Sequence, residues 1–184
     1  MKNILLVTYS QTGQVSGIAE QLVTPLAQAG HRVRVEYLQP ETPFPWPWRL
    51  IDFIDVFPEC VQLDAAPNRP LTLADDEDFD LVILAYQVWY LSPALPMTAF
   101  LKSAAARRLL AGKPVITLVA CRNMWLTAQA TLRRLIAAAG GRLIDHLAFV
   151  DRGPALATFV TTPRWVLTGR RDAFLGLPPA GVAE

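Results

Sequence analysis

The chain has 184 residues, of which 52% are hydrophobic and 18% are charged, and 17 basic residues balance 16 acidic ones to a net charge of +1. This length predicts a single domain over residues 1–184 that buries roughly 70% of its unfolded surface. The balanced charge argues against nucleic acid or an anionic membrane as partner. No apolar stretch reaches the ~18 residues of a membrane span or resembles a signal-peptide core, so we expect no membrane span and a cytoplasmic location.

Four residues of types that often carry chemistry stand isolated in the sequence. Cys60 and Cys121 lack C-x-x-C spacing, and His31 and His146 have no ligand-type residues around them. We therefore expect neither a disulfide framework nor a metal site, and no catalytic side chain is assigned.

The first elements in chain order predict a strand, a helix and a second strand. Asn3 to Val7 is an apolar run, and helical spacing of apolar residues extends from Val15 to Ala29, with Gly30 at the position of a C-terminal cap. The stretch 31–38 alternates basic and apolar residues, which predicts a strand at the edge of a sheet. Together these elements form a βαβ unit with a right-handed crossover.

The turn between the first strand and helix has the composition of an anion site. It runs from Thr8 to Val15, and a strand that re-enters as a helix presents free N–H groups and a positive dipole end. Ser10 and Thr12 can donate hydrogen bonds to a phosphate, and Gly13 permits close approach. The turn has no lysine and no Gly-x-Gly-x-x-Gly, which excludes the P-loop and the dinucleotide fingerprint. The alternative is an ordinary turn capped by Ser10 or Thr12.

Residues 39–78 interrupt the alternation of strands and helices. This insertion is rich in proline and aromatic residues, and only the stretch 48–57 is predicted to form a helix. It is either a packed surface lobe or a lid or subunit contact beside a ligand site. The acidic run 75–80 that closes it is read as a solvated loop.

The second half of the chain continues the α/β pattern. Strands are predicted at 81–85, 115–120 and 142–150, and helices at 94–103 and 126–139. A final helix over 155–168, interrupted by Pro163, is expected to cover the sheet before a tail at 169–184. The result is an α/β doubly wound fold, in which ligands bind beyond the carboxyl ends of the strands.

Two further loops are expected at the same carboxyl edge. The loop at 87–91 offers Trp89 and Tyr90, whose flat faces can lie against a conjugated ring. The loop at 121–125 offers Arg122, Asn123 and Trp125. A phosphate site beside aromatic walls suits an aromatic mononucleotide, whereas the alternative is that these aromatic residues only cap the sheet.

These motifs, in this order, resemble the flavodoxin-like superfamily over roughly residues 1–150. The resemblance rests on Ser10-Gln11-Thr12-Gly13-Gln14 after the first strand, on 79–82 leading into 86–93, and on 99–102 and 112–115. The second loop is similar to that of NAD(P)H:quinone reductases and other FMN reductases of this fold. The stretches 121–125 and 168–174 also resemble flavodoxin-like proteins labelled dialkylresorcinol condensing enzymes, a chemistry for which the sequence shows no nucleophile.

The resemblance implies a five-stranded parallel sheet of order 2-1-3-4-5 with helices on both faces. It also implies that the FMN phosphate is held by Ser10, Gln11, Thr12, Gly13, Gln14 and Val15. The ring would be flanked by Gln87, Val88, Trp89, Tyr90 and Leu91 on one side and by Cys121, Arg122, Asn123 and Trp125 on the other. Two departures are Val15, where a last threonine is usual, and the insertion, which replaces an ordinary crossover.

The expected function is an FMN oxidoreductase that passes electrons from NAD(P)H to a quinone-like or other conjugated small molecule. The alternatives are a flavodoxin-type electron carrier and an accessory protein of dialkylresorcinol-type biosynthesis. Carriers resemble one another in being strongly acidic, which this chain is not, although the run 75–80 could form a local docking patch. A homodimer is expected, and Arg170-Arg171 either meets the phosphate of a nicotinamide cofactor or is a solvated pair.

Overall fold

The computed structural model describes residues 1–122, 124–150 and 155–176. It contains a five-stranded sheet of order β2-β1-β3-β6-β7 in which every pairing is parallel. The strands are β1 (Asn3–Thr8), β2 (Arg32–Tyr37), β3 (Leu81–Tyr86), β6 (Pro114–Cys121) and β7 (Arg142–Val150). The predicted strand order and the edge position of β2 are both confirmed.

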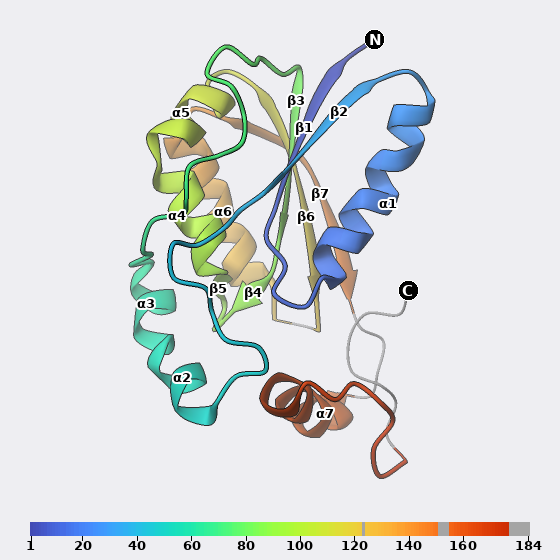
Figure 1. Ribbon diagram of the computed structural model, residues 1–184, viewed down its shortest axis with the longest axis vertical. Helices are drawn as coiled ribbons and strands as arrows, with labels where there is room; N and C mark the ends of the chain where they lie inside the picture. The colour runs from blue at the N-terminus through green and yellow to red at the C-terminus, as the bar shows by residue number, and fades with distance from the viewer. Residues whose placement is uncertain (123, 151–154, 177–184) are drawn as a thin grey trace.

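Helices cover both faces of the sheet, because successive residues of each buried strand point to opposite sides. On one side Ile4 and Leu6 pack against α1 (Gln14–Gln28). On the other side Leu5 and Val7 join a larger core with α4 (Leu95–Lys102), α5 (Ala104–Leu110) and α6 (Leu126–Ala138). Figure 1 shows α1 alone on one face of the sheet and α4, α5 and α6 on the other.

The helix expected at 94–103 is α4, and it is followed at once by α5, which was not predicted. Ser103 has extended backbone, with φ −77° and ψ 162°, so α4 ends there. Its side chain then accepts a hydrogen bond from the Ala106 N–H at 3.1 Å and caps α5. A serine within an apolar helical pattern is therefore a helix boundary here.

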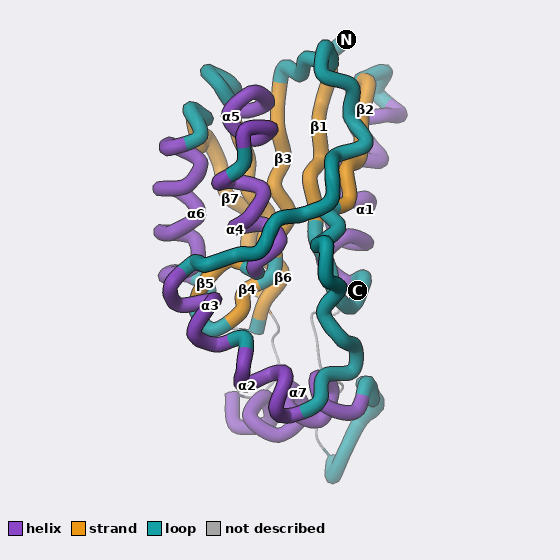
Figure 2. The backbone as a smooth tube through the Cα atoms, turned by 60° about the vertical axis from the view of Figure 1, so that its left-hand side comes forward, coloured by secondary structure: helices purple, strands orange, loops and turns teal. Residues whose placement is uncertain are grey.

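The insertion forms two short helices rather than one, α2 (Leu50–Asp55) and α3 (Phe57–Gln62). Its two ends are held together, since the Glu41 N–H donates to the Pro67 carbonyl at 3.2 Å and the Arg69 N–H to the Gln39 carbonyl at 2.7 Å. The returning chain is anchored on β2 through buried Glu36, which accepts hydrogen bonds from the backbone and hydroxyl of Thr72. The insertion is thus a packed lobe, which Figure 2 shows at the end of the sheet.

The final helix, α7 (Ala155–Thr168), has the predicted bounds and contains Pro163, but it lies elsewhere than expected. It runs across the carboxyl edge of the sheet next to the insertion instead of covering a sheet face (Figures 1 and 2). The Trp48 N–H donates to the Val166 carbonyl at 2.9 Å, and the rings of Trp46 and Trp165 meet edge to face at 5.8 Å. The tail beyond residue 176 lies outside the described residues.

None of the helices in the described part of the chain combines the length and apolar character that a bilayer crossing requires. Both cysteines are free thiols. Within the described ranges, no group of three or more His, Cys, Asp or Glu residues is placed to hold a metal ion.

Candidate functional site at the carboxyl edge

The turn from β1 to α1 forms an open helix start. Gly13 precedes the helix with φ +81°, a left-handed conformation that glycine adopts without strain. Ser10 Oγ accepts a hydrogen bond from the Val15 N–H at 3.1 Å, so this hydroxyl caps the helix as the alternative interpretation expected. No described residue accepts a hydrogen bond from the N–H groups of Thr12 and Gly13. These two donors are available to an anion at the positive end of the helix dipole.

A hollow of about 380 Å³ lies directly beside this helix start. Thr12, Gly13 and Gln14 form one side of it, together with the first turns of α1. Phe149, at the end of β7, and Trp165 and Arg171 form the opposite side. The Arg171 guanidinium lies 5.8 Å from the centre of the Trp165 ring. A cation from the end of the chain therefore reaches the turn that has no lysine of its own.

Arg171 is the one member of the predicted Arg170-Arg171 pair that lines the hollow. Arg170 is exposed and lies 3.6 Å from the Asp172 carboxylate. The sequence alone could not show which of the two arginines lines the hollow, because this depends on the path of the backbone after α7.

Gln11 ties the candidate phosphate turn to the insertion. Its side-chain amide donates to the Pro45 carbonyl at 2.7 Å and accepts from the indole N–H of Trp48 at 2.9 Å. The Gln11 backbone N–H donates to the side chain of Gln87 at 3.2 Å, which links the first loop to the second. The NH2 group and the carbonyl of the Gln11 side chain are thus both hydrogen-bonded to the insertion. The position of Gln11 in the phosphate motif did not predict this contact.

The second loop is a tight hairpin between β4 (Val88–Trp89) and β5 (Ser92–Pro93). Its two central residues, Tyr90 and Leu91, have φ values of +47° and +64°. Positive φ at both positions is what a type I′ turn requires, but neither residue is the Asn or Gly that favours it. The backbone of this loop is therefore held in a conformation that strains L-residues by ~1–2 kcal/mol each. Such strain concentrates at functional sites.

The aromatic side chains of the second loop pack mainly against the insertion. Trp89 meets Tyr9, Phe44 and Trp48 edge to face, at ring-centre distances of 5.8, 4.9 and 5.6 Å. Tyr90 packs against Phe53 and Phe57, and its hydroxyl donates to the Phe53 carbonyl. Burial raises the pKa of Tyr90 to about 12, so the phenol stays protonated and donating. The two side chains expected as free walls for a ring instead join the two loops to the insertion.

The third loop contacts α7 and β7. Arg122 donates to the Thr161 hydroxyl at 3.1 Å, and the Trp125 ring lies against His146 at 4.8 Å. Burial raises the pKa of the Cys121 thiol to about 11, which keeps it neutral. Asn123, also expected at this site, lies outside the described residues. Of the predicted ring-flanking residues, the structure thus brings those of the second loop next to the candidate phosphate turn.

A row of hydrogen-bonded, partly buried polar side chains lies near the site, and no pattern in the sequence predicted it. The Tyr86 hydroxyl donates to Gln129 at 2.8 Å, the Gln129 amide donates to the Thr117 hydroxyl at 2.9 Å, and that hydroxyl lies 2.8 Å from Nδ1 of His146. Thr117 Oγ1 therefore bridges the Gln129 amide and the His146 imidazole. Burial lowers the pKa of His146, which favours the neutral form of the ring. These hydrogen bonds link β3, α6, β6 and β7.

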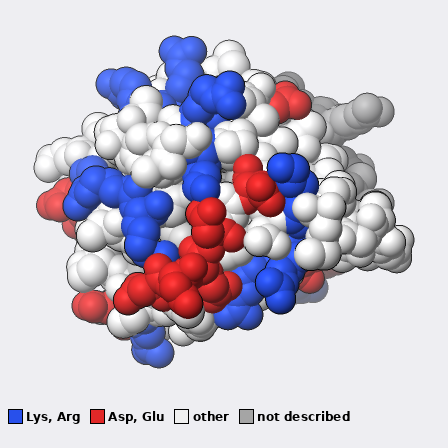
Figure 3. Space-filling model, turned by 90° about the horizontal axis from the view of Figure 1, so that it is seen from above, with Lys and Arg blue, Asp and Glu red and all other residues white. Residues whose placement is uncertain are grey.

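The acidic run lies at the opposite edge of the sheet from this site. Asp75, Asp78 and Asp80 pair with Arg108, Lys113 and Lys2, at 3.6, 2.8 and 3.3 Å. Asp80 also accepts from the Asn3 N–H at 2.8 Å, where β1 begins. Figure 3 views this amino edge end on and shows the acidic cluster bordered by basic side chains. The run therefore cannot serve as a docking patch around the carboxyl edge.

Comparison with known proteins finds similarity in structure alone. No protein-family model and no curated protein sequence matches the chain. A flavoprotein from Lactobacillus acidophilus NCFM, solved in complex with FMN, has a TM-score of 0.63 and 16% identity over 80% of this chain and 93% of its own. A protein from Bacteroides eggerthii DSM 20697, provisionally described as a flavoprotein, has a TM-score of 0.59 and 15% identity over 80% and 88%.

A flavodoxin from Streptococcus pneumonia TIGR4 has a TM-score of 0.50 and 17% identity over 81% of this chain and 84% of its own. These neighbours do not support the narrower resemblance to dialkylresorcinol condensing enzymes. With the strand order and the placement of the loops, they show that the chain has the flavodoxin-like fold.

Proposed function

We propose that the protein binds FMN, with the phosphate at the start of α1. The observation that carries the proposal is the pair of unengaged N–H groups at Thr12 and Gly13, open to a hollow that Arg171 also lines. A phosphate dianion there would gain charge-assisted hydrogen bonds, the favourable end of the helix dipole and a guanidinium. The FMN bound by the Lactobacillus acidophilus neighbour supports the same cofactor here. The residues present fit the phosphate end of this cofactor.

The ring of the cofactor would be flanked by the loops at 87–91 and 121–125. Because Trp89 and Tyr90 pack against the insertion, we propose that they support the second loop from behind. The strained turn at Tyr90 and Leu91 would then present backbone groups to the polar edge of the ring. Gln11 and Gln87 would hold the first and second loops in register.

We further propose a reductase that uses NAD(P)H and a quinone-like or other conjugated acceptor. Bound FMN supplies hydride and electron transfer, so no acid or base is required of the protein. The insertion and α7 both lie at the carboxyl edge, which favours an enclosed site for a small molecule. An electron carrier would need an exposed site edge with charges that steer a partner protein, whereas the acidic run is at the far edge and three of its aspartates are paired with basic side chains.

The test is anaerobic mixing of the FMN-loaded protein with NADH and, separately, with NADPH. We expect the flavin absorbance to bleach with at least one of them and to return when a small quinone is added, with no other protein present. Free FMN at the same concentration is the control for direct reduction. A flavin that stays oxidised with both nucleotides, but is reduced by a protein reductase, would replace this function with that of a carrier.

A homodimer remains part of the proposal, and the outer face of the insertion is the surface that supports it. Leu50, Ile51, Ile54, Phe57 and Val61 are between 49% and 60% exposed along α2 and α3. A second copy packed there would remove this apolar stripe from water. Sedimentation velocity of the wild type and of Ile54→Asp is the measurement, and a wild type that sediments as a monomer would end this part of the proposal.

A further inference from the structure

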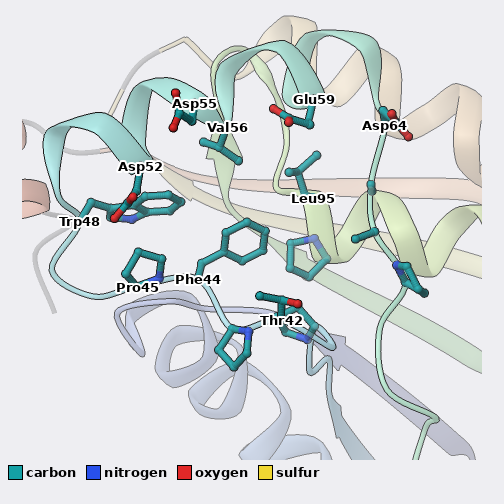
Figure 4. Close-up of a pocket in the computed structure, with 16 residues that line it drawn as sticks. Thr42, Phe44, Pro45, Trp48, Asp52, Asp55, Val56, Glu59, Asp64 and Leu95 are labelled. Carbon is teal, nitrogen blue, oxygen red and sulfur yellow. The ribbon is translucent and has the colours of Figure 1, made fainter.

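A cavity larger than the one at the start of α1 lies inside the insertion and shares no lining residue with it. Its volume is about 730 Å³, within the range of ~300–1,000 Å³ typical of small-molecule sites. One wall is formed by α2 and α3, the opposite wall by the loop at 40–45, and the end by Leu95 and Pro96 of α4 (Figure 4). These elements are held in place by the hydrogen bonds at the two ends of the insertion, so the cavity is largely pre-formed.

The inner surface of the cavity is apolar and aromatic. Phe44 points into it, and Trp48, Val56 and Leu95 lie around the ring (Figure 4). Prolines contribute most of the remaining surface, namely Pro40, Pro43, Pro45, Pro67 and Pro96. Rigid rings of this kind lose little side-chain entropy when they are covered, and aromatic faces also attract cations. The interior therefore suits an apolar or aromatic group.

The rim of the cavity carries charge of one sign only. Four carboxylates line it, from Asp52, Asp55, Glu59 and Asp64, and no lining residue is basic. Asp52 is paired with Arg49, which lies outside the lining, at 2.6 Å. No ion pair in the described part of the chain involves Asp55, Glu59 or Asp64, and all three are exposed. These carboxylates would repel an anion at the rim and attract a cation.

We propose that this cavity binds an organic cation with an apolar or aromatic body, such as a protonated arylalkylamine. The body fills the space around Phe44, and the ammonium group faces the carboxylates of Asp55, Glu59 and Asp64. Burial of the apolar body in the cavity provides the affinity, and the carboxylates at the rim favour a positively charged ligand. This inference does not depend on the proposed flavin chemistry, because none of the residues that line the cavity belongs to the phosphate turn.

Three probes of similar size test the charge selection, namely phenethylamine, 2-phenylethanol and 3-phenylpropionate. The full chain is titrated with each at neutral pH, and binding is followed by amide chemical shifts in two-dimensional NMR. We expect saturable shifts at Phe44, 55–57, Glu59 and 64–66 with the amine, a several-fold weaker response with the alcohol, and none with the carboxylate. Raising the salt concentration should weaken amine binding and leave the alcohol unchanged.

Substitutions at Asp55 and Glu59 test whether the carboxylates at the rim bind the ammonium group. Asp55→Asn and Glu59→Gln keep the size of the side chains, and neither carboxylate makes a hydrogen bond on which the described fold depends. Each change should weaken amine binding about two- to fivefold, the range for a solvent-exposed ion pair. The matched control is Asp76→Asn, an exposed carboxylate of the run at the amino edge. Equal affinity for the three probes, shifts mapping elsewhere, or a double variant with unchanged affinity would overturn the proposal.

Discussion

Gln11 offers the sharpest test of how the insertion is held on the fold. Replacing it with leucine preserves the approximate size of the side chain and removes both side-chain hydrogen bonds to the insertion. The Gln11 backbone bond to Gln87 is unaffected, because it uses the main-chain N–H. The change therefore separates the contact with the insertion from the contact with the second loop.

The two lost hydrogen bonds should not contribute equally. Pro45 is exposed, so water can replace the amide as donor to its carbonyl. Trp48 is only 5% exposed, and its indole N–H would be left without an acceptor. An unsatisfied buried donor costs ~1–3 kcal/mol, so we expect Gln11→Leu to destabilise the closed insertion by about 2 kcal/mol.

Hydrogen exchange of the Trp48 indole N–H, followed by NMR, measures this loss locally. A change of about 2 kcal/mol corresponds to a roughly 30-fold increase in the exchange rate when exchange follows opening of the insertion. Gln28→Leu, at an exposed position at the end of α1, is the control for introducing a leucine. If both variants exchange at the wild-type rate, the contact between Gln11 and the insertion does not stabilise the closed state.

Three further changes probe the strained turn, the anchor of the insertion and the partly buried His146. Leu91→Gly should raise the free energy of unfolding in urea by up to ~1 kcal/mol, because glycine relieves the positive φ of a residue that is 44% exposed; a decrease would mean that the turn is not strained. Thr72→Val removes a 2.6 Å hydrogen bond to buried Glu36 and should lower the free energy of unfolding by roughly 1.5 to 3 kcal/mol, whereas the control Thr127→Val, at an exposed position on α6, should change it little. The folded-state pKa of His146 is lowered by burial, so the unfolded chain binds the proton first as pH falls below ~6.5 and stability declines there. Urea unfolding from pH 7.5 to pH 5 should show a smaller decline in His146→Gln, and an identical decline in both proteins would exclude this linkage.

The sheet could be predicted from the sequence because its signals are local. β1 and β3 are continuous apolar runs buried on both faces, and β2 alternates because it is an edge strand. The turn proposed to hold the phosphate could be located for the same reason, since the strand, Gly13 and the helix pattern follow one another directly. Such signals depend on residues close in sequence, and the fold repeats them in a regular order.

What the sequence did not reveal depends on contacts between distant segments. Trp89 has the aromatic character of a ring wall, but its partners Phe44 and Trp48 belong to the insertion. The hairpin at Tyr90 and Leu91 lacks Asn or Gly, so turn chemistry gave no signal for it. The approach of Arg171 to the phosphate turn depends on α7 crossing the carboxyl edge, which no local pattern specifies.

The hydrogen bonds of the turn decide whether Ser10 or Thr12 should be changed to test phosphate binding. Ser10 and Thr12 were expected to be equivalent hydroxyl donors, but Ser10 Oγ already caps α1 through Val15. Removing it would weaken the helix by ~0.5–2 kcal/mol whether or not a phosphate binds. Thr12, whose hydroxyl has no hydrogen-bond partner among the described residues, is the residue to change.

Binding of the FMN phosphate at the start of α1 can be measured by comparing FMN with riboflavin, which lacks only that phosphate. Quenching of flavin fluorescence on titration with the protein gives both affinities. We predict that FMN binds at least about tenfold more tightly than riboflavin, and that Thr12→Val weakens FMN about tenfold without changing riboflavin. Equal affinities for the two flavins, or no binding of FMN, would show that the start of α1 does not hold this phosphate.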